Sequence, residues 1–97
     1  MIAFLLALSL QQPLAKPDAL DSYKTCIDDA VARRIKSGER DAVAIAREAM
    51  DECDHLRDQA HLYAIFAGSD MGPNRFRATY FDRAVAVAKK TLAGAAQ

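Results

Sequence analysis

The sequence predicts a small all-α protein, and three observations support that fold class. The chain has 97 residues, enough for one domain. Alanine is abundant and β-branched residues are few, which favours helices over strands. Apolar residues recur every three to four positions, the period of an α-helix. We therefore expect one three-helix domain over residues 16–97, built on a disulfide-linked antiparallel helical hairpin and preceded by a signal-like N-terminal helix.

Residues 1–15 have the character of a secretory signal peptide. They contain no charged side chain, and the apolar stretch at residues 2–10 has the length of a signal core but is too short for a membrane span. Pro13 ends that stretch, and polar residues begin at Lys16. We expect export, to a bacterial periplasm or outside the cell. Pro13 fits a cleavage site after Ala15 poorly, so an uncleaved anchor and a helix packed on the domain remain alternatives.

The first predicted helix covers residues 18–37. Pro17 and Asp18 suit its start, because proline has no N–H to satisfy there and a carboxylate favours the positive end of the helix dipole. Gly38 suits the left-handed conformation that commonly ends a helix. One apolar stripe at helical spacing faces the expected core and contains Leu20, Tyr23, Ile27, Ala30, Val31 and Ile35.

The second predicted helix covers residues 40–67 without interruption. Its apolar residues alternate steps of four and three, as in helices that pack closely together. We call this set the alanine-rich stripe: Ala42, Ala46, Ala49, Cys53, Leu56, Ala60, Tyr63 and Ala67. Small side chains allow a neighbouring helix to come close. If no helix of the same chain fills this stripe, it offers a surface for self-association.

The third predicted helix covers residues 73–93 and begins at Pro73. Its apolar face is broad, so we expect burial against the first two helices. That face contains Phe76, Tyr80, Phe81, Ala84, Val85, Val87, Ala88, Thr91 and Leu92. Arginines and lysines between the aromatic residues are compatible with nucleic acid or a membrane surface, but the aromatic residues continue the apolar stripe and the basic ones then form its solvated face.

A disulfide between Cys26 and Cys53 is the strongest prediction from the residue spacing. The connection after Gly38 is short, so the first two helices fold back on each other. Cys26 lies 12 positions before Gly38 and Cys53 lies 13 positions after Arg40, which places them at nearly the same height. An oxidising compartment preserves such a bridge. The alternative is two free, buried cysteines in a cytosolic protein.

One polar cluster is a candidate metal site. Asp54, Asp58 and His61 share a face of the second predicted helix, as do Asp51, His55 and Asp58, and oxygen and nitrogen donors suit a divalent metal. The alternative is that this helix face is simply exposed to solvent, with ion pairs to Arg57. Cys53 and His55 do not form a catalytic pair, because close neighbours on a helix point in different directions.

The charge balance and the absence of catalytic motifs restrict the function classes that this sequence allows. Lys plus Arg and Asp plus Glu number 13 each, a balance that argues against a protein built to grip nucleic acid or anionic lipid. Neither a phosphate-binding loop nor a nucleophile elbow occurs, so we expect neither an enzyme nor a cofactor. We expect an exported, non-enzymatic binding or interaction module whose partner is another envelope protein or a second copy. The alternative is a metal- or small-ligand-binding protein using Asp54, Asp58 and His61.

Overall fold

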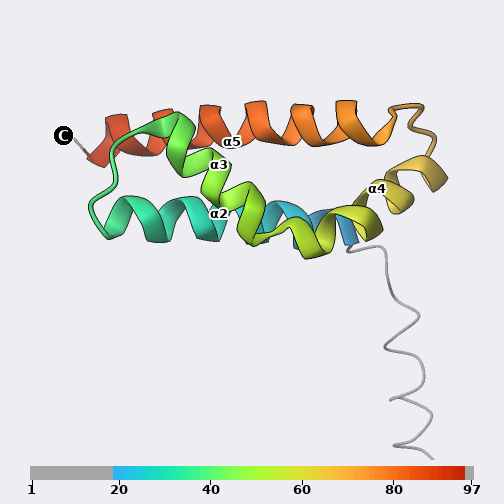
Figure 1. Cartoon of the computed structure of the whole chain (residues 1–97), viewed down its shortest axis with the longest axis horizontal. Coiled ribbons are helices and arrows are strands. Elements are labelled where there is room, and N and C mark those ends of the chain that lie inside the picture. The colour runs from blue at the N-terminus through green and yellow to red at the C-terminus, as the bar shows by residue number, and fades with distance from the viewer. Residues whose placement is uncertain (1–18, 96–97) are drawn as a thin grey trace, which may run out of the picture.

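The computed structural model of the chain describes residues 19–95, and these fold into helices without any strand. In chain order the elements are α2 (Ala19–Lys36), α3 (Ala42–Glu52), the 3-10 helix η2 (Asp54–Leu56), α4 (Arg57–Phe66) and α5 (Pro73–Ala95). α2 and α5 run in the same direction, and α3 and α4 return between them in the opposite sense (Figure 1). The all-α class is confirmed. The signal-like segment at residues 1–15 lies outside the described residues.

α2 forms where the sequence predicts it, because the residues at its two ends and its apolar stripe favour the same helix. Asp21 lies in the first turn, and cationic side chains occupy the last turn. Gly38 has a φ of 110°, and its N–H donates to the Ile35 carbonyl at 3.1 Å. The Glu39 N–H donates to the Arg34 carbonyl at 3.0 Å, which completes a Schellman motif. The buried side chains of α2 are Tyr23, Ile27, Ala30, Val31 and Ile35.

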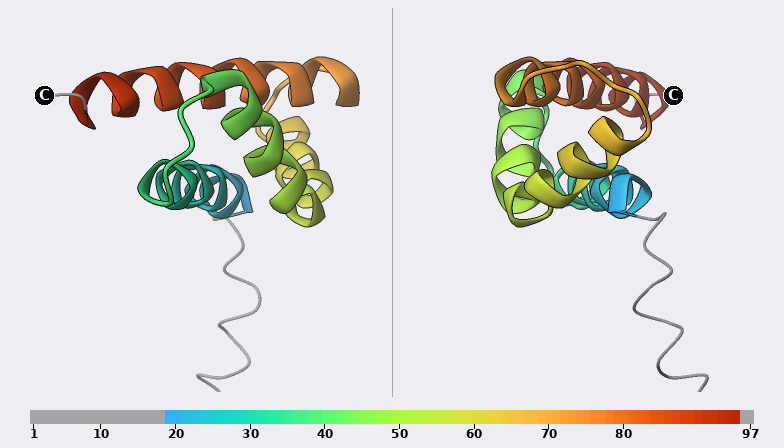
Figure 2. Two further views of the ribbon diagram at one scale, coloured as in Figure 1. Left: turned by 60° about the vertical axis from the view of Figure 1, so that its left-hand side comes forward. Right: turned by 90° about the vertical axis from the view of Figure 1, so that its right-hand side faces the viewer.

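α3 begins after Asp41, whose carboxylate accepts from the N–H groups of Val43 and Ala44 at 3.1 and 3.2 Å. The helix buries Ile45, Ala46, Ala49 and Met50. Viewed along the long axis, α3 connects the level of α5 with the level of α2 on one side of the molecule (Figure 2). It packs against both helices, so the first part of the alanine-rich stripe is filled within the chain. Self-association through that part is therefore ruled out by its burial.

The prediction of one continuous helix over residues 40–67 is wrong. α3 ends at Glu52, Cys53 leaves the helical conformation with φ −97° and ψ 6°, and η2 connects to α4. Aspartate, cysteine and histidine are weak helix formers, and residues 51–55 are made of these types with one glutamate. Acidic side chains also disfavour a helix C-terminus but favour the N-terminus of the next one, where Asp58 lies in the first turn of α4.

The disulfide forms as predicted, with the Cα atoms of Cys26 and Cys53 5.9 Å apart. That separation is ordinary for a disulfide, and the bridge ties the end of α3 to α2. Arg34 adds ion pairs to Glu48 at 3.2 Å and to Glu52 at 2.8 Å across the same two helices. Arg83 of α5 makes a two-pronged bond to Asp28 of α2 at 2.9 and 3.1 Å.

Within residues 19–95, no helix combines the length and the apolar character needed to cross a bilayer.

Candidate interaction surface

α4 carries large apolar side chains on its solvent side. Leu62, Ile65 and Phe66 are 52%, 43% and 80% exposed, whereas the side chains of the core are almost fully buried. Their spacing of three and four residues places them on one face of the helix. We call these three residues the α4 face. Contiguous exposed apolar residues of this kind mark interaction sites more often than isolated ones do.

The α4 face is exposed because small residues occupy the opposite side of the same helix. Ala60 is fully buried and Ala64 packs against the core, so α4 contacts α2 through alanines. Gly68 ends the helix with a φ of 105°, and the Ser69 N–H donates to the Ala64 carbonyl at 2.9 Å, a second Schellman motif. These contacts fix the rotation of α4, which leaves its larger side chains in solvent.

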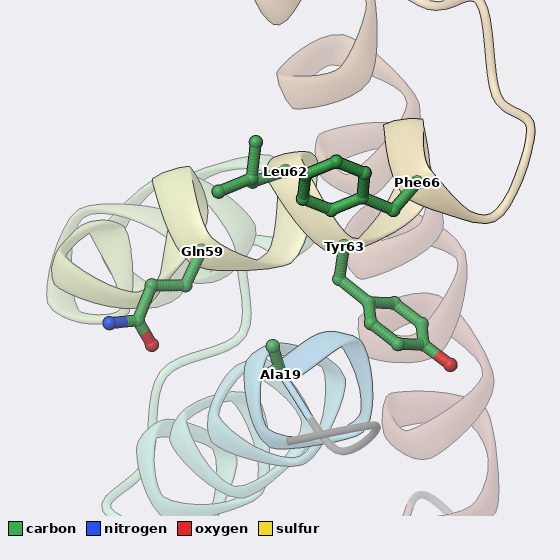
Figure 3. A pocket seen from close by; sticks show the side chains of 5 residues that line it. All are labelled: Ala19, Gln59, Leu62, Tyr63 and Phe66. Atoms are coloured by element: carbon green, nitrogen blue, oxygen red, sulfur yellow. The ribbon is translucent and has the colours of Figure 1, made fainter. Parts of the chain in front are cut away.

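A pocket of about 260 Å³ adjoins the α4 face, between α4 and the first turn of α2. Its lining is formed by Ala19, Gln59, Leu62, Tyr63 and Phe66. Gln59 and Tyr63 extend from α4 toward the side of Ala19, and Leu62 and Phe66 lie next to each other along α4 (Figure 3). Leu62 and Phe66 belong both to the α4 face and to the lining of the pocket.

The charges near this surface are acidic. Arg57 is the only arginine or lysine of α4, and it is already engaged by Asp54 at 3.2 Å and by Asp58 at 3.6 Å. The Asp58 side chain is 94% exposed, and Asp70 is exposed in the loop that follows α4. An anionic membrane is therefore a poor partner for the α4 face, because amphipathic helices that bind such membranes carry lysine and arginine on their polar side.

The three predicted metal ligands do not come together. Their shared face required a continuous helix, and the break at Cys53 separates Asp54 from the register of the other two. The His61 Nε2 bonds to the Met71 carbonyl at 2.8 Å, which closes the loop between α4 and α5. Over residues 19–95, no group of three histidine, cysteine, aspartate or glutamate side chains is arranged to hold a metal ion.

The second acidic set is also used in local contacts. Asp51 pairs with Arg77 of α5 at 3.3 Å, and the His55 Nδ1 lies 3.2 Å from the Glu52 carbonyl. These contacts are the ion pairs and local hydrogen bonds of an ordinary solvated face. The ion pair of Asp51 with Arg77 therefore helps to hold α3 against α5.

A cluster of aromatic rings fills the core between α2 and α5. Tyr23 stacks on Phe76 with ring centroids 6.0 Å apart, and Tyr80 lies 5.3 Å from Tyr23. Burial raises the pKa of Tyr23 above its ordinary value of 10.0, and burial raises that of Tyr80 in the same way. The Tyr23 hydroxyl has no hydrogen-bond partner among the described residues. Because Tyr23 is fully buried, this cluster serves packing and offers no access to a substrate.

The α4 face was not predicted from the sequence, although a signal for it is present. Leu62, Ile65 and Phe66 lie outside the alanine-rich stripe and follow a helical spacing of their own. A surface helix normally turns one apolar side to the core. A second apolar side on the same helix is therefore a candidate for exposure.

No protein-family model matches this chain, and no curated protein or solved structure is significantly similar to it.

Proposed function

We propose that this protein is exported and acts without catalysis, as a module that binds a partner protein through the α4 face and the adjoining pocket. One observation carries the proposal: Leu62, Ile65 and Phe66 point into solvent beside an apolar hollow, although each is of a type that folding normally buries. Pockets of this kind accept a large apolar side chain of a partner.

Export is supported by two independent features. The disulfide between Cys26 and Cys53 suits an oxidising compartment, and the apolar, uncharged residues 2–10 suit a secretory signal. The intact mass of the protein recovered from its host tests both features at once. We expect a mass that lacks the leader and two hydrogens. A full-length mass with both thiols free contradicts export.

The binding role is tested by photo-crosslinking in the native host. The photoreactive residue benzoylphenylalanine replaces Phe66 in one variant and Ala86, an exposed residue of α5, in a control. We expect a discrete adduct with one partner from position 66 and not from position 86. The adduct disappears when Leu62→Asp is added. Equal labelling from both positions, or none from position 66, overturns the proposal.

A further inference from the structure

We propose that the partner binds the α4 face through a short amphipathic helix whose polar side is basic. One large apolar side chain of that helix enters the pocket, and a nearby lysine or arginine pairs with Asp58. This inference rests on the proposed function, because it names the kind of partner segment that the same surface takes.

Asp58 shares the solvent side of α4 with the α4 face. It precedes Leu62 by four residues and Ile65 by seven, and residues at these spacings lie on one side of a helix. From Asp58 to Phe66 this side of α4 extends over about 12 Å. A carboxylate therefore stands at one end of the apolar row, one helical turn from Leu62.

The end of α4 that carries Asp58 has an excess of negative charge. Arg57 lies 3.2 Å from Asp54 and 3.6 Å from Asp58. Arg77 lies 3.3 Å from Asp51 and 3.9 Å from Asp54. Two guanidinium groups thus face three carboxylates, which leaves one negative charge uncompensated.

The uncompensated charge is most accessible at Asp58. Its side chain is 94% exposed, against 70% for Asp51 and 46% for Asp54. At 3.6 Å the contact with Arg57 is too long for a hydrogen bond, so the Asp58 carboxylate can accept one from a partner. Asp70 is exposed in the loop after α4. A basic partner is attracted by these charges and an acidic one is repelled.

The pocket sets the apolar part of the partner. Its volume of about 260 Å³ is below the range of about 300–1,000 Å³ that is typical of sites for small-molecule ligands. Leu62 and Phe66 border it on α4, and Gln59 and Tyr63 extend from α4 toward Ala19 (Figure 3). One large apolar side chain of a protein segment suits this space better than a free small molecule does.

The extent of the surface favours a short segment over a folded partner. A standard interface takes about 800 Å² and 20–30 residues from each partner, more than three exposed side chains and one pocket supply. Residues 19–95 contain no strand to which an extended segment could add. Two turns of an amphipathic helix, laid into the groove between α4 and the first turn of α2, match the row of about 12 Å. A contact of this size is of the weak, transient kind.

Fluorescence anisotropy with three labelled model peptides tests the charge preference. The peptides have about 15 residues, enough to form a helix. They share one apolar side of leucines and a phenylalanine, and their other positions are all lysine, all glutamine or all glutamate. We expect the oxidised protein recovered from its host to bind the lysine peptide about tenfold more tightly than the glutamate peptide, with the glutamine peptide between them. Equal affinities, a preference for glutamate, or no binding of the lysine peptide overturns the inference.

Matched variants test whether the preference comes from Asp58. Asp58→Asn removes the charge beside the α4 face, and Asp82→Asn removes one from an exposed position of α5 as the control. We expect Asp58→Asn to weaken binding of the lysine peptide about three- to fivefold, the size of an exposed ion pair, and to leave the glutamine peptide unchanged. Asp58→Glu should keep the parent's affinity, and so should Asp82→Asn. Equal losses in the two asparagine variants reveal a general attraction to negative charge and contradict the inference.

The inference and the proposed function fail separately. A partner adduct from position 66 in the host, together with equal binding of the three peptides, removes only the inference. A preference for the lysine peptide without any adduct from position 66 in the host removes the proposed function. A dimeric adduct from position 66 identifies a second copy as the occupant and overturns the inference.

Discussion

The α2–α3 pair and α4 use apolar residues in opposite ways. In α2 and α3 most large apolar side chains are buried, although Val43 is 41% exposed, and a disulfide joins the two helices. In α4 the buried side is made of alanines, and the large apolar side chains lie in solvent. The contrast indicates that α2 and α3 carry the stability of the domain. α4 instead leaves its large apolar side chains exposed, which is the observation behind the proposed binding role.

The largest expected difference separates two phenylalanines. Phe76 is 1% exposed within the aromatic cluster, whereas Phe66 is 80% exposed. Phe76→Ala should lower the free energy of unfolding by about 3–5 kcal/mol, because it leaves a cavity in the core. Phe66→Ala should lower it by less than about 1 kcal/mol. Urea titrations of the two variants make the comparison, and equal losses contradict the division between core and interaction surface.

Removing the disulfide should have the next largest effect. The two cysteines are 27 positions apart, and a bridge of that span stabilises by about 3.5 kcal/mol in the chain-entropy model. Cys26→Ser with Cys53→Ser should therefore lose much of the stability of so small a domain. Urea unfolding of the reduced parent provides the matched control. An unfolding midpoint that does not move refutes the assignment of stability to α2 and α3.

A smaller effect is expected at the turn between α2 and α3. Gly38 has a φ of 110°, which strains any residue with a Cβ, whereas Gly72 is free of that restriction and has open space around it. Gly38→Ala should cost about 1 kcal/mol, and Gly72→Ala should be neutral. Thermal unfolding of both variants checks the difference. Equal melting temperatures contradict the importance of the Gly38 cap for the hairpin.

The smallest effect at neutral pH is expected at Tyr23. Its hydroxyl is buried without a partner among residues 19–95, so Tyr23→Phe should be neutral or stabilising by up to about 1 kcal/mol at pH 7. The pKa of Tyr23 is raised by burial from its ordinary value of 10.0. Above pH 10 the unfolded chain loses this proton while the folded chain keeps it, so stability falls as the pH rises.

Alkaline unfolding curves of the parent and of Tyr23→Phe check this sign. The variant should keep more of its stability above pH 10, with Tyr80 supplying the part of the loss that remains, because burial raises the pKa of Tyr80 too. A variant that is less stable than the parent at every pH reveals a hydrogen bond from the Tyr23 hydroxyl.

Local signals predicted much of the fold. The stripe of α2, the glycine after it and the proline that opens α5 each act within a few residues, so they can be read from the sequence. The pairing of Cys26 with Cys53 followed from a short turn, which fixes the relative height of two antiparallel helices. The break at Cys53 was missed because the alternation of apolar residues continues through it, and periodicity alone does not reveal a change of axis.

The sequence by itself determined that this chain forms helices, where most of them begin and end, and which two cysteines meet. These features depend on backbone propensity, helix termini and loop length, all of which act over short distances. Only the tertiary structure decided that the acidic residues and His61 do not form one site and that Leu62, Ile65 and Phe66 face solvent. The first outcome depends on the break of the helix at Cys53. The second depends on how α4 is rotated against α2, which the packing of small alanines in the core sets.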